Sequence, residues 1–541
     1  MKEKKQSFMI GVATIFVSQL LVKILGLLYR VIITNFEGFG DTGNGFYSAG
    51  FQIYTLLLAI SSVGIPNAIS KLVSEKISIG DVKSAKRIFK VALGLFFTIG
   101  ISLSILLYIG AGFVADVIIK MPGAKYTLKA LAPSILFVSL SSVIRGYFSG
   151  MQNMRATSNS QVLEQFFKST LTILIVYLLA GYPAEIMAAG ANFATSIATV
   201  LSFCYLIYFY KRNDIKKPYG DLVYHTKNTP ALTIAKTILM VSIPISISSV
   251  ITAINRVLDT MTVMRGLDWA FLHIIPDAAA RHDEAVRLTG VLSKVDILTN
   301  LPLALNIAFA TALVPATAGA LAVGDRATAS KRVSFSLLIT ILIVFPCTGG
   351  FIALADPILK LLFPAASSGA GLLMVASITL VFTAIAQTVY GSLQGLGKVF
   401  VPATSIGIGC IIKLILNILL IPIPKINIYG AAIGSLACQF TACFLSVRVL
   451  SKNIKLDFSI SKYVIKPAFA TFLMSVFAWL SNNILIKLNF APRIATVLAI
   501  SASVLVYFIL VVSLNIFTKE DYSMLPFGHK IYKALQKAKL V

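Results

Sequence analysis

The chain has 541 residues, of which 57% are hydrophobic and only 13% are charged, and its formal net charge at pH 7 is +26. This composition excludes an ordinary soluble protein and indicates an all-α, polytopic membrane protein. The positive charge does not point to nucleic acid, because most Lys and Arg residues fall in short loops between apolar runs, where membrane topology uses them.

The apolar runs that are long enough to cross about 30 Å of hydrocarbon predict about fourteen transmembrane helices. In chain order they cover residues 8–33, 46–70, 88–119, 127–150, 160–181, 185–210, 236–265, 288–316, 332–356, 370–394, 399–423, 428–450, 463–487 and 491–517. The first run follows "MKEKKQ" and contains no small-residue cleavage site, so it is expected to be an uncleaved span rather than a signal peptide.

The distribution of Lys and Arg predicts the orientation. The segments on the N-terminal side of the membrane carry about three times as many of these residues as the opposite side. Positively charged loops stay in the cytoplasm. We therefore expect a multi-pass protein of the cell membrane with both termini cytoplasmic.

The sequence also repeats itself. Gly146 precedes Gly391 by the same offset that separates Lys168 from Lys413, and "GDVKSAKR" precedes "GDRATASKR" by a nearly equal offset. Two six-helix halves running in the same direction should be related by an axis along the membrane normal, with a cavity between them. The predicted domains are an N-lobe at 1–210, a cytoplasmic linker at 211–235, a C-lobe at 236–450, two further helices at 451–517 and a basic cytoplasmic tail at 518–541.

Charged residues inside the spans are the main functional signal, because a charge near the bilayer centre costs several kcal/mol. Lys23 and Arg30 are two helical turns apart on the first span, on the same side, and that span contains no acid. The cations within spans are Lys23, Arg30, Arg145, Lys168, Arg256, Lys294 and Lys413, and the acids are Asp116, Glu164, Asp259 and Asp296. A positive interior favours an anion, and phosphate oxygens suit Arg and Lys.

Several of these charges also have structural interpretations. Glu164 and Lys168 are one turn apart and are expected to pair locally, and Arg256 can pair with Asp259 in the same way. Lys294 lies near enough to the outer surface to extend its ammonium to the headgroups. Arg145 lies near the cytoplasmic end of its helix and could reach the headgroups on that side.

Lys413, with Asn417 one turn further on, suits either a structural role or a role as a cavity-facing residue that substitutes for an ion. The loop at residues 266–288 mixes aromatic and charged residues and is expected to lie along the outer interface as a short helix. The five cysteines and four histidines form no metal-binding or catalytic pattern. We therefore expect no enzyme activity, no metal and no cofactor.

Two stretches carry a family resemblance: "GNGFYSAGFQIYTLLLAISSVGIPNAISKLVSE" at residues 43–75 and "LPLALNIAFATALVPATAGA" at residues 301–320. They resemble the polysaccharide-biosynthesis and stage V sporulation protein B group of Gram-positive bacteria. That group belongs to the multidrug/oligosaccharidyl-lipid/polysaccharide superfamily and is similar to the lipid II flippase MurJ. The likeness covers nearly the whole chain.

The resemblance implies that an undecaprenyl-diphosphate-linked sugar moves from the inner to the outer leaflet between two lobes, while the last two helices guide the lipid tail. MurJ-like proteins carry two cations on the first helix. Lys23 matches that pattern and Arg30 stands one position late. The second helix of MurJ-like proteins contributes an Arg, whereas residues 46–70 offer only Gln52 and Asn67 as larger polar groups.

The sequence thus predicts a flippase for a lipid-linked diphosphate sugar, with a lipid II-like precursor favoured. Its partners are expected to be that substrate and membrane lipids, with sodium or protons as candidate coupling ions and no nucleic acid. The alternatives are a cation-coupled small-molecule exporter, a flippase for another polysaccharide lipid intermediate, and a scaffold. The predicted substrate-binding residues are Lys23, Arg30, Arg256, Arg145, Lys294, Asn67 and Gln52, and the predicted ion-coupling or cavity residues are Asp259, Lys413 and Asn417.

Overall fold

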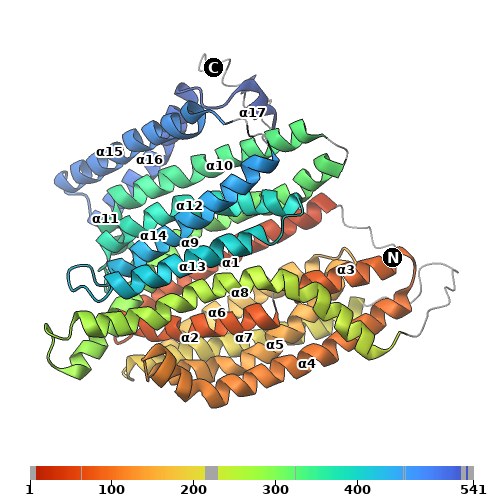
Figure 1. Ribbon diagram of the computed structural model, residues 1–541. Helices are drawn as coiled ribbons and strands as arrows, with labels where there is room; N and C mark the ends of the chain where they lie inside the picture. Colours follow the sequence, from red (N-terminus) through yellow and green to blue (C-terminus); the bar gives the residue numbers. More distant parts are fainter. Residues whose placement is uncertain are drawn as a thin grey trace. The chain divides into compact units, whose positions relative to one another are not determined.

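The computed structural model describes residues 8–62, 64–213, 229–322, 325–454, 456, 458–524, 532–533 and 536, and these residues form helices joined by turns (Figure 1). The chain divides into two compact units. Unit 1 comprises Met1–Lys294 with Asn417–Asn427, and unit 2 comprises Val295–Leu416 with Ile428–Val541. The leader at residues 1–7, most of the predicted linker and most of the predicted tail lie outside the described residues.

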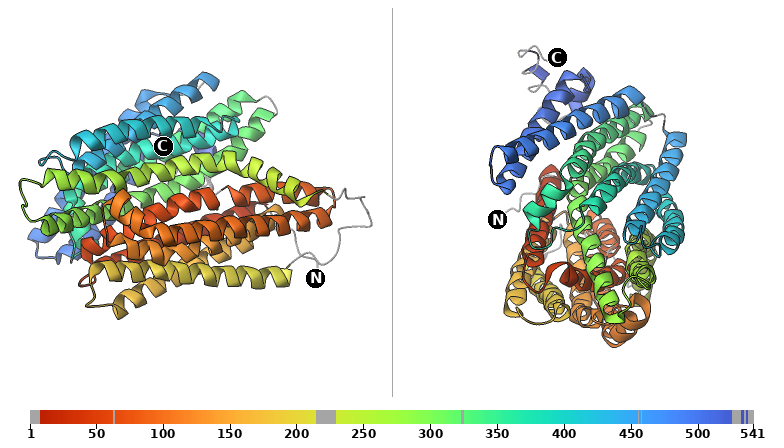
Figure 2. Two further views of the ribbon diagram at one scale, coloured as in Figure 1. Left: turned by 60° about the horizontal axis from the view of Figure 1, so that its bottom comes forward. Right: turned by 90° about the vertical axis from the view of Figure 1, so that its left-hand side faces the viewer.

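Unit 1 is a bundle of long helices that lie lengthwise beside one another (Figures 1 and 2). Its elements are α1 (Phe8–Thr34), α2 (Gly40–Ser61), α3 (Ile65–Ser78), α4 (Val82–Phe113), η1 (Val114–Ile119), α5 (Ala124–Gly150), α6 (Arg155–Leu178), α7 (Ala184–Asn213), α8 (Ala231–Ala270) and the first part of α9 (Ala278–Ala322). Helix α6 packs on α1 and α7, and α2 packs on α5, α7 and α8. These neighbours place the charges of α1, α2 and α6 inside one bundle.

Unit 2 holds the rest of α9 and most of α13 (Val401–Leu420), together with the C-terminal helices. Its other elements are α10 (Arg326–Ala353), α11 (Ala355–Leu362), α12 (Ala370–Gly395), α14 (Tyr429–Asn453), η2 (Ser461–Ile465), α15 (Lys466–Lys487), α16 (Pro492–Ser513) and α17 (Lys519–Met524). Helices α15 and α16 pack together, and α15 also packs on α10 (Figure 1).

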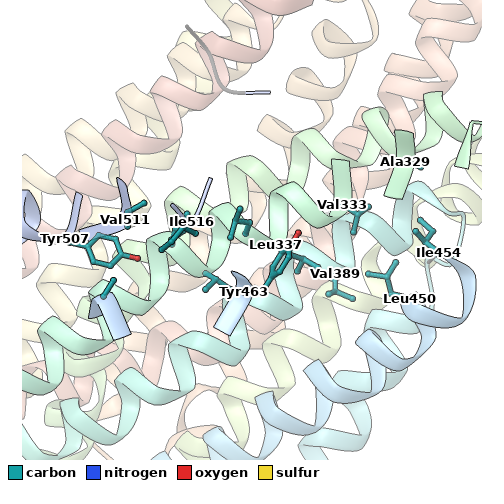
Figure 3. Packing of buried hydrophobic residues seen from close by; sticks show 14 of the residues in the cluster. Ala329, Val333, Leu337, Val389, Leu450, Ile454, Tyr463, Tyr507, Val511 and Ile516 are labelled. Atoms are coloured by element: carbon teal, nitrogen blue, oxygen red, sulfur yellow. The ribbon is translucent and has the colours of Figure 1, made fainter. Parts of the chain in front are cut away.

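Buried aliphatic and aromatic side chains hold each unit together. In unit 2 they come from α10, α12, α14, η2 and the end of the α15–α16 pair, and Figure 3 shows Leu337, Val389, Leu450 and Tyr463 among them. Other apolar side chains stay exposed, such as Phe472 on α15 and Leu505 on α16, which are 63% and 65% exposed. Exposed apolar surface of this kind suits contact with lipid.

The helices lie at the positions of the predicted spans. Each of the fourteen predicted ranges overlaps a helix in the described part of the chain. Among those helices, eleven are long and apolar enough to cross a membrane, and α8, which bends by 52°, would make twelve. Helices α6 and α9 are not among them. The exact count of fourteen therefore stays a prediction.

The loop predicted to form a short interfacial helix folds differently. Helix α8 continues to Ala270, a turn follows, and α9 already begins at Ala278. The two flanking helices extend into this segment because its residues continue their backbone hydrogen bonding, as in the bond from the Phe271 amide to the Leu267 carbonyl. The prediction of a separate helix was wrong.

Two local features recur at positions that the repeat makes equivalent. Asp81 caps α4 by accepting a hydrogen bond from the Ser84 amide at 2.9 Å, and Asp325 caps α10 in the same way through the Thr328 amide, also at 2.9 Å. A side chain at Gly146 would collide with the Pro66 backbone, and one at Gly391 would collide with the Ala310 carbonyl. This repeated packing agrees with the predicted duplication. The lobe boundaries themselves stay a prediction.

Candidate functional site

The two cations of α1 lie in different surroundings. Lys23 is exposed, whereas Arg30, two turns further on, is only 5% exposed. Helical spacing predicted that both cations point to the same side of α1, but spacing does not determine how deeply each one is buried. Because burial of a cation without a counter-charge is costly, the surroundings of Arg30 are the first feature of the site to explain.

Arg30 is held by polar and aromatic groups rather than by an acid. Its guanidinium carbon lies 4.1 Å from the centre of the Tyr47 ring on α2, and its Nη2 donates a hydrogen bond to the Ser293 hydroxyl on α9 at 3.0 Å. Within the described residues, its Nη1 has no hydrogen-bond partner. A cation over an aromatic face is stabilised by the ring quadrupole, but this leaves hydrogen-bonding capacity for an anion.

Lys23 lies close enough to Arg256 on α8 for the two positive charges to repel each other. Arg256 is exposed, as is Lys23. Two like charges at such a separation repel each other, and an anion bound beside them would weaken that repulsion. The sequence placed these two cations on different predicted lobes, whereas both belong to unit 1.

Arg145 has a local structural partner. Its Nη2 contacts the Glu164 carboxylate at 2.7 Å, and it also donates to the Ser160 and Ser202 hydroxyls at 2.9 and 3.1 Å. This network ties α5 to α6 and α7. The prediction that Glu164 pairs with Lys168 was wrong, because the Glu164 carboxylate forms its ion pair with Arg145.

Lys294 is completely buried and forms an ion pair with Asp41 on α2, with 2.7 Å between Nζ and Oδ1. The expectation that its ammonium reaches the headgroups was wrong. The acid lies 253 positions away in the sequence, in a segment that precedes the predicted second span. The helices meet closely here, since a side chain at Gly290 would overlap the Asp41 carbonyl.

The structure brings together two of the predicted ion-coupling residues. The Asn417 amide on α13 donates to the Asp259 carboxylate at 3.2 Å and to the Thr262 hydroxyl at 2.9 Å. Asn417 and Lys413, one turn before it, are each 1% exposed. A carboxylate with a buried amide beside it can bind a cation or take up a proton.

The remaining predicted residues lie on α2 and α3. Gln52 is partly buried on α2, and Asn67 is exposed on the first turn of α3. The described geometry assigns neither of them to the cation groups above. Sequence reasoning missed Asp41, Tyr47 and Ser293, which contact the predicted cations. Asp41 and Tyr47 fall at or before the start of the predicted second span, and Ser293 carries no charge that would have marked it.

Within the described residues, no group of three or more His, Cys, Asp or Glu side chains is placed to hold a metal ion. The groups described above are cations, carboxylates, hydroxyls and aromatic rings, and the cations, hydroxyls and rings lie on α1, α2, α8 and α9. Such a set can bind an oxyanion by charge and hydrogen bonds.

Residues 8–319 match the family model described as polysaccharide biosynthesis protein. Stage V sporulation protein B of Bacillus subtilis (strain 168) is 25% identical over 534 residues, which cover 96% of this chain and 98% of that protein. Lipid II flippase MurJ of the same strain is 24% identical over 435 residues, which cover 77% of this chain and 78% of that protein.

A solved structure of lipid II flippase MurJ in an inward closed conformation has the same fold, with a TM-score of 0.68 and 18% identity. It covers 91% of this chain and 97% of that chain. The activity named among these proteins is the flipping of a lipid, which is transport rather than catalysis. The fold resemblance and the apolar helices establish a multi-pass membrane protein.

Proposed function

Because the chain belongs to the polysaccharide biosynthesis protein family, we propose that it is a flippase for an undecaprenyl-diphosphate-linked cell-envelope precursor, with a lipid II-like peptidoglycan precursor as the first candidate. It works by alternating access across the cytoplasmic membrane, with both termini in the cytoplasm, and performs no chemistry on its cargo. The coarser role, a membrane flippase or transporter, follows from its homology.

The electrostatics of three cations carries the substrate class. Lys23 and Arg256 lie within electrostatic reach of each other, and buried Arg30 has an Nη1 without a partner among the described residues. Cations that repel each other in a membrane protein favour binding of an anion that bridges them. A diphosphate supplies several acceptor oxygens for such cations. An exporter of cationic drugs would need the opposite charge here.

The carboxylate of Asp259 is the proposed coupling group. It accepts a hydrogen bond from Asn417 and follows Arg256 by three positions on α8. Sodium binding or protonation at Asp259 would change the charge beside Arg256 and so couple an ion gradient to anion release. Asp259→Asn should remove any dependence of transport on that gradient, and unchanged dependence would exclude Asp259 from coupling.

A binding measurement tests the function. The purified protein in nanodiscs is titrated with lipid II and, separately, with a cationic dye of the kind that multidrug exporters carry. We expect saturable binding of lipid II that weakens in Lys23→Ala and Arg256→Ala. Binding of the dye alone would favour the cation-coupled exporter and overturn the proposal. Binding of a different lipid-linked diphosphate in place of lipid II would retain the flippase and change its cargo.

A further inference from the structure

Lys168 on α6, which no assignment above uses, lies beside aromatic rings of α1 and α2 in unit 1. Its Nζ lies 4.3 Å from the centre of the Phe51 ring on α2 and 6.0 Å from that of Tyr29 on α1. Arg30 lies over Tyr47 in the same way. We call these five residues, Tyr29, Arg30, Tyr47, Phe51 and Lys168, the aromatic cation cluster.

The three aromatic residues of the cluster contact one another in sequence. Tyr47 and Phe51 are stacked with their centres 5.8 Å apart, and the Tyr29 and Tyr47 hydroxyls are hydrogen-bonded at 3.0 Å. The cations of Arg30 and Lys168 therefore lie over neighbouring rings, and both act electrostatically on the Tyr29 hydroxyl. Three helices, α1, α2 and α6, thus bring two positive charges to one group of linked aromatic residues.

The position of Lys168 follows from how α6 packs on α1. The Gln19 amide donates to the Gln161 side chain at 2.9 Å, and the Ser169 hydroxyl donates to the Leu25 carbonyl at 3.4 Å. Ser169 faces α1, and the residue before it, Lys168, points about 100° further around the helix. In that direction Lys168 meets the Phe51 ring on α2.

Neither cation is neutralised by an acid in the part of the chain that the structure describes. Glu164, one turn before Lys168, is bound by Arg145 at 2.7 Å. A purely structural lysine in a membrane bundle is expected to have a carboxylate partner, as Lys294 has in Asp41. Lys168 is partly buried and instead has ring faces, which hold a cation more weakly than a phosphate does.

We propose that Lys168 is a phosphate-binding residue, and that its ammonium and the Arg30 guanidinium together bind the diphosphate of the lipid-linked cargo. The rings hold the two cations in place when no cargo is bound. When cargo arrives, its phosphate oxygens accept hydrogen bonds from the Nη1 of Arg30, which has no other partner among the described residues, and from the ammonium of Lys168. This inference rests on the proposed function, because it assumes a diphosphate cargo, and it adds a binding residue on α6.

The test is a titration of the full-length protein in nanodiscs with undecaprenyl diphosphate. The variants are Lys168→Gln, which removes the charge, and Lys168→Arg, which keeps it. Lys129→Gln is the matched control, because Lys129 also lies over an aromatic ring, that of Tyr108 at 5.5 Å, but outside the cluster. Since Lys168 has no acid partner, its neutral variant leaves no orphaned buried charge and should fold.

We expect Lys168→Gln to weaken binding of undecaprenyl diphosphate about ten- to hundredfold, which is the worth of one charge-assisted hydrogen bond. Lys168→Arg should restore most of the affinity, and Lys129→Gln should leave it unchanged. Undecaprenyl monophosphate should bind more weakly than the diphosphate and lose less in Lys168→Gln. Equal affinity of wild type and Lys168→Gln for the diphosphate would refute the role of Lys168.

Further arms separate the possible sources of phosphate. If wild type does not bind undecaprenyl diphosphate at all, the proposed function fails together with this inference. If wild type binds it and Lys168→Gln loses only affinity for phosphatidylglycerol, the cluster is a site for membrane lipid and the inference alone fails. Inorganic pyrophosphate that competes with undecaprenyl diphosphate in wild type, and less well in Lys168→Gln, would support the shared diphosphate chemistry.

Discussion

The buried ion pair between Asp41 and Lys294 should behave as a strongly coupled unit. Lys294 is 0% exposed and Asp41 is 8% exposed, with 2.7 Å between their charged atoms. Removing one partner of such a pair leaves an uncompensated buried charge, which costs about 3–5 kcal/mol. Lys294→Met and Asp41→Asn should each lower the free energy of unfolding by about that amount.

The double variant should be much less damaging than the sum of the two single variants. With both charges replaced, no orphaned charge remains, and replacement of a buried pair by uncharged residues is often close to neutral. We expect a coupling free energy of about 2 kcal/mol or more from the double-mutant cycle. The assay is equilibrium unfolding of the purified protein by SDS in mixed micelles, followed by far-UV circular dichroism.

An exposed ion pair supplies the matched control. Asp356 and Lys360 on α11 pair at 2.8 Å with side chains that are 53% and 64% exposed. Their replacement should cost less than about 1 kcal/mol, because water solvates both charges equally well when the pair is broken. The reasoning would be refuted if the single variants of Asp41 and Lys294 cost no more than this control, or if their effects simply added.

Three further predictions follow from the packing and from the charge distribution. Gly290→Ala should destabilise the protein, because the new methyl group collides with the backbone of Asp41. Gly94 has open space around it, so Gly94→Ala should be neutral or raise the free energy of unfolding by up to about 1 kcal/mol, and equal melting temperatures of the two variants would contradict the tight contact at Gly290. Arg145→Gln should lower the free energy of unfolding by about 2 kcal/mol or more. Arg145→Lys should recover only part of that stability, because one ammonium cannot reach Glu164, Ser160 and Ser202 together, and full recovery would argue against the network. In a variant without the five native cysteines, Glu37→Cys should react with a membrane-impermeant maleimide added outside intact cells, and Lys83→Cys only after permeabilisation; the reverse pattern would invert the proposed topology.

The helices were predictable because apolar run length is read directly from sequence and the bilayer sets the length of a span. The ends were less so. The prediction started the eighth span at residue 288, whereas α9 begins at Ala278, since charged residues such as Arg281 and Glu284 continue a helix beyond the hydrocarbon. Hydropathy marks where a span is apolar and leaves its polar extension unseen.

Within the candidate site, the sequence revealed the cations but not their partners. Arg30 meets Ser293 across 263 positions, and Lys294 meets Asp41 across 253. No helical periodicity links residues so far apart. Local spacing even misled at Glu164, whose neighbour at one turn is Lys168 but whose partner is Arg145 on α5. Which acid a buried cation selects is decided by tertiary packing, which single-sequence patterns do not contain.

The central claim is that cationic side chains within the membrane bind the diphosphate of a lipid-linked cargo, and a lipid-flipping assay in proteoliposomes tests it most directly. Lipid II is incorporated in one leaflet, and its appearance in the other is followed for wild type and for the Lys23→Ala, Arg30→Ala double variant at matched protein levels. The account predicts transport by wild type and its loss in the double variant. Undiminished transport by the double variant would make both cations structural and contradict the claim.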